Sequence, residues 1–422
     1  MKNRVFSKKI ITVLLLAAFC VAGCGKSTDT GTVESGKIIV GSATPKPEAS
    51  EGTTMAPADP TAKPAESSAD TPAPITSDPG TEPTEEPTPE PTVTPVPTRT
   101  IDPNARPFTI SFVGDVLMSY GLCNNYAKGG ILGVVSQKVL DKMTSADFMV
   151  ANHEYCCTDI DKSNAVKYQT YIEHATTDKE HIFAELGIDV AGFANNHGYD
   201  YGPQGFLDTL DILTKYNIPY VGAGRNSDES NKPVIIEKYG IKIAIFAANG
   251  VITHRDWISG PNKPGMNSLW DLPQYDSYAK TIENIKKASE ECDLVIGMPH
   301  FGDEMHYDMN AVQKQYAHAW VDAGCDIIIG SHPHVLQGME YYNNGIIFYS
   351  LGNFLFEGHR RETCIVTITY DPQSLSYDIS VMPCLAHNYR TDDVSDNSVF
   401  DLMNKHSINA KIEPDGKLVR TK

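Results

Sequence analysis

Clusters of lysine and arginine are missing from the part of the sequence that has the composition of a folded domain. The chain of 422 residues has 35 basic and 53 acidic side chains and a net charge of -18. This charge argues against a nucleic-acid partner, which would require a basic surface. The same acidity does not attract a polyanionic substrate, so a bound cation would have to do so locally.

Cysteine pairs with the spacing of a zinc ribbon are also missing, which argues against that class of structural zinc site. The nine cysteines include Cys20 and Cys24 near the N-terminus. The seven others are an odd number, so they cannot all pair within one chain. We expect most of them to be small buried apolar side chains, with a disulfide framework as the alternative.

The apolar run near the N-terminus, from Ile10 to Val21, is too short for a comfortable transmembrane span. Basic residues precede it, at Lys2, Arg4, Lys8 and Lys9. This order is typical of an export signal. The run ends in VAGC at residues 21–24, which resembles a bacterial lipobox.

The lipobox resemblance implies that residues 1–24 are a lipoprotein signal peptide and that Cys24 carries the lipid. The protein would then be lipid-anchored at the extracytoplasmic face of the cell membrane. An ordinary signal peptide with an unrelated cysteine is the alternative.

Residues 25–107 are rich in Pro, Thr, Ser, Ala and Glu. We expect a disordered linker, partly polyproline II, because so few apolar side chains cannot offset the entropy of folding.

From residue 108 onward, apolar runs alternate with segments of helical periodicity, which indicates an α/β domain at 108–388. Tyr239-Gly240 has the character of a hairpin turn. Helices are expected in the sequences YGPQGFLDTLDILTKYNIP, PQYDSYAKTIENIKKASEECD and NAVQKQYAHAWVDAGCD. Residues 389–422 form a polar, weakly patterned tail. Strands are expected at 109–113, 148–151, 190–193, 234–237, 241–247, 294–298, 327–329, 346–349 and 364–370.

Polar side chains collect at the ends of several of these expected strands. They are Asp115, Asn152, Glu154, Asn195, Asn196, His197, Asp200, His300, Glu304, His332, His334 and Asn353. In an open α/β sheet the carboxyl ends of parallel strands share one edge, and ligands bind there. We therefore expect these residues to meet in one crevice.

Each residue by itself has a simpler explanation. Asp115 has the position of a turn or cap residue, Asn195-Asn196 that of a loop pair, and His300 alone could be structural. The H-x-H of His332 and His334 directs two imidazoles to one neighbourhood. Repetition of the pattern at successive strand ends favours a ligand site, because independent caps have no reason to gather there.

A mixture of Asp, Glu, Asn and His favours Mn, Fe or Zn over purely oxygen-bound cations. An open site of nitrogen and oxygen ligands can polarise a phosphoryl oxygen and activate water near neutral pH.

The motifs GDVLM, ANHE, NNHGYDYG, GAGRN, HFGDE, GCDIIIGSHPHVLQGME and YSLGNF, in this order, resemble those of the bacterial capsule-synthesis protein CapA family of the poly-gamma-glutamate capsule machinery. The resemblance covers residues 108 to 385. That family is similar to the calcineurin-like metallophosphoesterases, which implies a four-layer sandwich with two central β-sheets flanked by helices.

The resemblance also implies roles for individual residues. The implied ligands of one or two divalent ions are Asp115, Glu154, Asn196, His300, His332 and His334. His197 would donate a proton to a leaving oxygen or steady the phosphoryl group, and Asp200 would orient it. The expected substrate contacts are Asn152, Asn195, Glu304 and Asn353.

The sequence departs from the metallophosphoesterase pattern at several positions. Leu117 stands where a histidine is usual, His153 replaces a leucine, and Ser331 stands where a histidine is often seen. No G-D-x-x-D motif with a bridging aspartate is found, so either one metal binds or Glu154 bridges two.

Two functions agree with this pattern. One is a metal-dependent hydrolase or transferase that acts on an ester, or on an amide of a capsular polymer. The other is a non-catalytic accessory of a capsule export assembly that binds metal and polymer. Expected partners are the membrane, through the lipid, an anionic capsular polymer or phosphoester, and other capsule-synthesis membrane proteins.

Overall fold

The computed structural model describes residues 37–39, 106–166, 171–272 and 276–421. The predicted signal peptide and the lipidation site at Cys24 lie outside the described residues, as does most of the predicted linker. Within the described ranges, no helix has both the length and the apolar character needed to cross a membrane.

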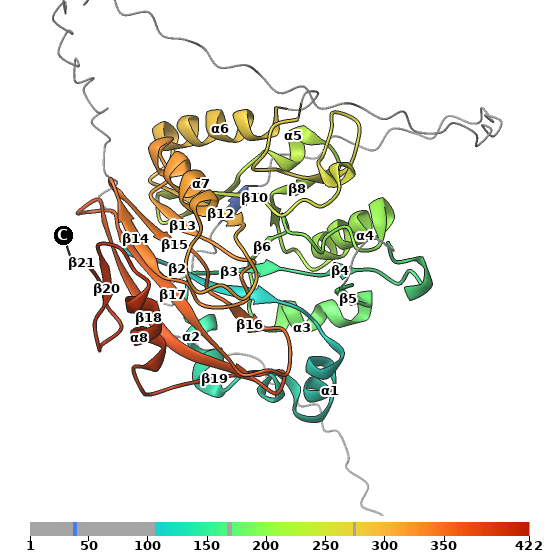
Figure 1. Cartoon of the computed structure of the whole chain (residues 1–422), viewed down its shortest axis with the longest axis horizontal. Helices are drawn as coiled ribbons and strands as arrows, with labels where there is room; N and C mark the ends of the chain where they lie inside the picture. The colour runs from blue at the N-terminus through green and yellow to red at the C-terminus, as the bar shows by residue number, and fades with distance from the viewer. Residues whose placement is uncertain (1–36, 40–105, 167–170, 273–275, 422) are drawn as a thin grey trace, which may run out of the picture. The chain divides into compact units, whose positions relative to one another are not determined.

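Two mixed β-sheets form the centre of the structure (Figure 1). The first, seven-stranded sheet has the spatial order β1 Lys37–Ile39, β9 Val234–Lys238, β10 Ile241–Asn249, β12 Leu294–His300, β13 Ile327–Ile329, β15 Gly345–Phe348 and β14 Met339–Tyr342. The second, eight-stranded sheet runs β19 Arg390–Asp393, β18 Ser376–His387, β17 Arg361–Asp371, β2 Phe108–Val116, β3 Phe148–His153, β6 Val190–Gly192 and β7 Tyr220–Val221, with β16 Asn353–Leu355 also paired to β2.

Helices pack against both sheets, most of them on the outer faces. Those of eight residues or more are α1 Tyr120–Gly129, α2 Gln137–Thr144, α4 Gly202–Lys215, α6 Ser277–Glu291, α7 Ala311–Asp322 and α8 Ser398–Lys405. The shorter ones are α3 Glu180–Glu185 and α5 Ser227–Ser230. Paired short strands complete the fold: β4 Cys156–Cys157 with β5 His174–Ala175, β8 Ala223–Gly224 with β11 Gly265–Met266, and β20 Ala410–Ile412 with β21 Leu418–Arg420.

Strand periodicity explains the layers. In β10, Ile243 and Ile245 join the hydrophobic cluster that both sheets share, whereas Ala244 and Phe246 join a second cluster under α6 and α7. Successive side chains of a strand point to opposite faces, so one strand serves both clusters. A third cluster lies between the other sheet and α1 to α4. The predicted four-layer α/β sandwich is confirmed.

The predicted strands and helices are found close to their expected positions. Tyr239-Gly240 joins β9 to β10, which pair antiparallel, and both residues have positive φ, as a tight hairpin turn requires. Pro203 lies in the first turn of α4, where a missing N–H has no consequence. The seven cysteines from Cys123 onward are free, and five are buried, as expected.

Two segments differ from the sequence prediction. Lys37–Ile39, inside the predicted linker, forms β1 and pairs antiparallel with β9, because its β-branched isoleucines favour an extended backbone that completes the edge of the sheet. The segment 389–422 is not a separate tail: β19 pairs with β18, and α8 inserts Phe400 and Met403 into the cluster between the sheets. The folded domain therefore extends past residue 388.

The integration of α8 can be tested by replacing Met403, which is fully buried, with alanine. Loss of this side chain from the core should lower the free energy of unfolding by about 2–5 kcal/mol. Lys405→Ala, at an exposed position of the same helix, should change it by less than about 0.5 kcal/mol. Denaturant unfolding measures both; equal small effects would show that α8 does not stabilise the domain.

Candidate metal centre

The carboxyl ends of parallel strands from both sheets carry the predicted site residues. Asp115 near the end of β2 pairs in parallel register with Asn152 of β3 on one side and with Asn353 of β16 on the other. In the other sheet, His300 ends β12 and forms a parallel bridge with Ser331, just after β13. The site is therefore built by two sheets rather than by one.

A close backbone contact allows β2 and β16 to meet. Gly114 faces Gly352, which has a φ of 67°, and a Cβ atom placed on Gly114 would lie 1.9 Å from the Gly352 oxygen. A side chain at position 114 would thus push the strands apart. The contact brings Asp115 N to 2.9 Å from Gly352 O, which fixes Asp115 beside Asn353.

The turn that carries His332 and His334 has an unusual backbone. His332 has a φ of 96° and His334 a φ of 59°, in the left-handed region that residues other than glycine rarely adopt. Such conformations persist where the surrounding structure enforces them, and they concentrate at functional sites. The ring of His332 lies 5.7 Å from that of His334 and 4.9 Å from that of His300.

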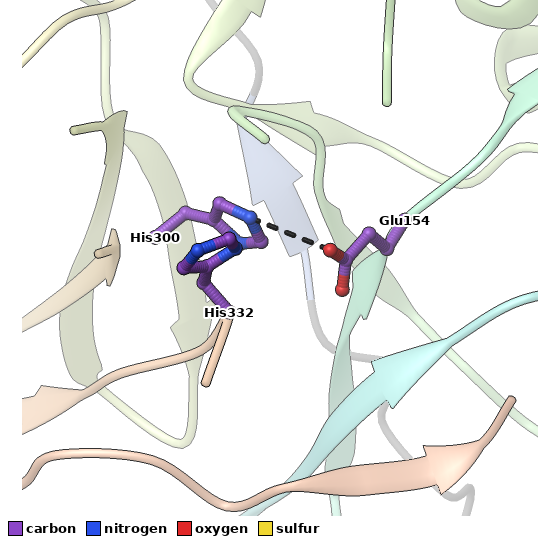
Figure 2. A group of neighbouring side chains, drawn as sticks. All are labelled: Glu154, His300 and His332. Carbon is purple, nitrogen blue, oxygen red and sulfur yellow. Dashed lines mark ion pairs between the residues drawn. The ribbon is translucent and has the colours of Figure 1, made fainter. Parts of the chain in front are cut away.

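Two fully buried carboxylates face these histidines. The side-chain amide of Asn152 donates from Nδ2 to Asp115 Oδ1 at 2.8 Å and to Glu154 Oε2 at 3.1 Å. The other oxygens, Asp115 Oδ2 and Glu154 Oε1, accept no hydrogen bond, and His332 Nδ1 has no hydrogen-bond partner either. Glu154 Oε1 lies 3.4 Å from His300 Nε2 (Figure 2). Asp115 Oδ2 lies 3.4 Å from His334 Nδ1.

Burial shifts the pKa values of these groups. Desolvation, reinforced by the neighbouring Asp115, raises the pKa of Glu154 well above its usual value. Desolvation and the nearby histidines lower the pKa of His300 well below its usual value and that of His332 to about 3. Burial also opposes protonation of His334, but its contacts with Asp115 and Asn353 raise its pKa. His300 and His332 are therefore neutral and able to offer lone pairs.

These residues fit a divalent cation. Three overlapping groups each have one ligand atom per residue within 4.8 Å of the others: Glu154, His300 and His332; Glu304, His332 and His334; and Asp115, Glu154 and His334. The orphaned carboxylate oxygens supply negative charge where neutral imidazoles supply nitrogen ligands. Buried charges require such pairing or a metal, and this donor set suits Mn, Fe or Zn.

Asn196 and His197 join the cluster from the loop after β6. Asn196 Oδ1 lies 2.7 Å from His300 Nε2. His197 Nδ1 is 2.8 Å from Asp200 Oδ2, which also accepts the backbone N–H of Glu173 at 2.7 Å. An Nδ1–H donated to Asp200 orients the ring and leaves Nε2 as the nitrogen that can exchange a proton.

The three asparagines predicted as substrate contacts instead form contacts with other groups of the protein. Asn152 binds both carboxylates, and Asn195 Nδ2 donates to His153 O at 2.8 Å. Asn353 Oδ1 lies 2.8 Å from His334 Nδ1. Because all three are buried and engaged with neighbouring groups, they position other residues of the site. Glu304, the fourth predicted contact, is exposed and remains available to a ligand.

Two contributors were not assigned from the sequence. Ser331, noted only as a departure, places its Oγ 2.9 Å from His300 Nδ1 and so holds that ring. Glu173 is half-buried, and its charge interacts with His197 and His334. It lies just before the short strand β5, away from the strand-end pattern, so no sequence signal indicated it.

The sequence matches a protein family and two characterised relatives. The model of the family described as "Bacterial capsule synthesis protein PGA_cap" matches residues 109–358. The PGA biosynthesis protein CapA of Bacillus subtilis (strain 168) is 34% identical over 256 residues, which cover 58% of this chain and 63% of that protein. The capsule biosynthesis protein CapA of Bacillus anthracis is 33% identical over 255 residues, covering 59% and 60%. The chain thus spans less than two thirds of either relative.

Solved structures align more distantly. A phosphatase from Mycoplasma pneumoniae has a TM-score of 0.42 at 14% identity, covering 71% of this chain and all of that one. The NAD nucleotidase NadN of Haemophilus influenzae has a TM-score of 0.41 at 12% identity, covering 72% and 64%. The family match spans more than half of the sequence and includes Asp115, Glu154, Asn196, His300, His332 and His334. The chain belongs to the bacterial capsule synthesis protein PGA_cap family.

Proposed function

We propose that this protein is a metal-dependent hydrolase that acts on an anionic ester or amide during biosynthesis of a poly-gamma-glutamate capsule or a similar surface polymer. The observation that carries the proposal is the meeting of two buried carboxylates and three histidines, with Asp115 Oδ2, Glu154 Oε1 and His332 Nδ1 left without hydrogen-bond partners. The capsule context comes from the family and from the two CapA relatives.

The proposed ligands are Asp115, Glu154, Asn196, His300, His332 and His334. When bound, one or two Mn, Fe or Zn ions would polarise a phosphoryl or carbonyl oxygen as Lewis acids. The protein itself supplies the proton transfer. His197, oriented by Asp200, would protonate the leaving oxygen or nitrogen through Nε2.

Cys24 is proposed to carry a lipid that holds the domain at the extracytoplasmic face of the cell membrane. The residues between Cys24 and the domain would act as a spacer. That location would bring the site to an anionic polymer and to other capsule-synthesis membrane proteins.

A second candidate function is binding of metal and polymer without turnover. It is favoured by Leu117, which stands where the related phosphoesterases have a histidine and is buried in the cluster beneath α1 to α4. An apolar side chain there removes one catalytic or ligand imidazole. Ser331, which holds His300, offers no imidazole either.

Metal binding can be tested with Glu154→Gln. The raised pKa of Glu154 means that the folded metal-free protein holds a proton which the unfolded chain releases above pH 4.5. Metal-free stability therefore falls as pH rises from 4.5 toward the folded-state pKa. At neutral pH, Glu154→Gln should melt at a higher temperature than the parent when a chelator is present, and should lose most of the stabilisation that Mn²⁺ gives the parent.

Thermal melting with and without chelator, together with elemental analysis, measures these effects. Glu290→Gln, at an exposed position on α6, is the charge-matched control and should behave as the parent in both conditions. A parent protein that contains no transition metal after mild purification and gains no stability from added Mn²⁺ would contradict the proposed centre.

Turnover can be distinguished from binding with His197→Ala. The full chain, loaded with Mn²⁺, should hydrolyse a generic phosphodiester or poly-gamma-glutamate, and the variant should lose about 10²- to 10⁴-fold in kcat. Its metal content should be unchanged, since His197 is not among the proposed ligands. His181→Ala, on α3, is the control and should retain activity.

His332→Ala should lose both metal and activity. Activity that persists in His197→Ala and His332→Ala alike would contradict the catalytic assignment. Metal binding without turnover of either substrate by the parent would favour the accessory function.

A further inference from the structure

The segment between β16 and β17 carries the sequence Glu357-Gly358-His359-Arg360-Arg361, which brings basic side chains to an acidic region. Arg361 is the first residue of β17. Its side chain is 25% exposed and that of Glu357 is 38% exposed. Neither residue belongs to the cluster of proposed metal ligands.

Contacts on two sides place Arg361 beside that cluster. Its Nη2 lies 3.8 Å from the sulfur of Met305, and the backbone N–H of Met305 donates to Pro333 O at 2.9 Å, between the two histidines of the H-x-H turn. On the other side, Glu357 directly follows Phe356, whose ring lies 4.8 Å from the ring of His334. The guanidinium thus lies where two loops that touch the H-x-H turn come together.

The hydrogen-bonding capacity of Arg361 is poorly used. Its Nε is buried without a hydrogen-bond partner. Nη1 reaches Arg360 O at 3.4 Å, and Nη2 reaches Glu357 Oε1 at 3.4 Å. A thioether sulfur such as that of Met305 is only a weak acceptor. A guanidinium presents five donors in a planar fork that matches the two oxygens of a carboxylate or phosphate.

The charges around the site favour such a group for the binding of an anionic substrate. Asp115 and Glu154 lie inside the site, and Glu173, Glu304 and Glu357 lie around it. An incoming oxyanion would be repelled by these carboxylates unless cations offset them. The carboxylate of Glu357 lies between two basic groups, Arg361 at 3.4 Å and His359 at 3.8 Å.

We infer that Arg361 is a substrate-recognition residue, which binds a carboxylate or phosphate oxyanion of the substrate next to the metal centre, and that Glu357 occupies this subsite in the free protein. The inference rests on the proposed function, because it assigns the specificity of the same site. The γ-linked glutamate carboxylates of a capsular polymer and the phosphate of a phosphoester share this chemistry.

Calorimetric binding to the full chain loaded with Mn²⁺ tests the inference with two probes, a γ-linked glutamate oligomer and inorganic phosphate. Arg361→Gln should weaken binding of whichever probe the parent binds by about 10- to 100-fold, since a charge-assisted pair of hydrogen bonds is lost. Arg361→Lys should restore only part of the affinity, because it keeps the charge but not the fork. Metal content should equal that of the parent in both variants. The probe that binds identifies the source of the oxyanion.

Glu357→Gln should change the affinity for the probe in the opposite direction. Removal of the Glu357 carboxylate should tighten binding of the same probe by about two- to tenfold. If the ion pair were purely structural, its loss would weaken binding in Arg361→Gln and in Glu357→Gln alike. Arg420→Gln is the charge-matched control. This exposed arginine contacts Asn343 O in the β14–β15 turn, at the start of β15, whereas the site lies at the carboxyl ends of the parallel strands. Its replacement should leave the affinity within about twofold of the parent.

Four results would overturn the inference. Binding by Arg361→Gln within twofold of the parent would do so and leave the proposed function intact. Loss of metal from Arg361→Gln, or weaker binding by Glu357→Gln, would give the ion pair a structural role instead. Failure of the metal-loaded parent to bind either probe would overturn both this inference and the proposed action on an anionic substrate.

Discussion

Asp115 and Glu154 share one hydrogen-bond donor, the side-chain amide of Asn152, and each leaves one buried oxygen without a partner. Burial raises the pKa of Glu154, and repulsion by the neighbouring Asp115 raises it further. The nearest imidazoles do not supply enough opposing charge, because the pKa values of His300 and His332 are lowered and only that of His334 is raised. Neutral nitrogen ligands and buried carboxylate oxygens without partners together form a donor set that a cation would satisfy.

The two-sheet architecture is what brings these opposing groups together. Asp115, Glu154 and Asn196 come from one sheet, whereas His300 and His332 come from the other. Their relative positions depend on the packing of the two sheets through the shared hydrophobic cluster. Within the site, the contact of Gly114 with Gly352 and the left-handed backbone of His332 and His334 set the final geometry. The left-handed backbone of His332 and His334 therefore holds two proposed ligands in a conformation that the surrounding structure must enforce.

The region around the site is acidic, as is the chain as a whole. A carboxylate-rich region repels anions, so selectivity for an anionic ligand depends on a few well-placed cations rather than on the average surface. Glu173 interacts electrostatically with His197 and His334 on one side and with Glu357 on the other.

Much of the fold follows from local sequence pattern. Apolar runs predicted strands such as β10 and β13 within a few residues, because burial on both faces leaves a continuous hydrophobic signature. β18 was missed: its twelve residues vary in exposure and include Pro383. The segment from residue 389 was missed as well, because its buried residues, such as Phe400, Met403 and Ile412, are scattered among polar ones.

The sequence by itself determined which residue types stand at the ends of successive strands, and hence that Asp115, His300 and His332 would meet in one crevice. This prediction was possible because the strand, the turn and the polar side chain follow one another within a few consecutive residues. Only the tertiary structure decided that Asn152 bridges two carboxylates, that Asn353 holds His334, and that Glu173 and Arg361 lie beside the site. Those relations join residues far apart in the chain, such as Asn152 and His300, which lie 148 positions apart. They depend on strand register and sheet packing, which no local pattern specifies.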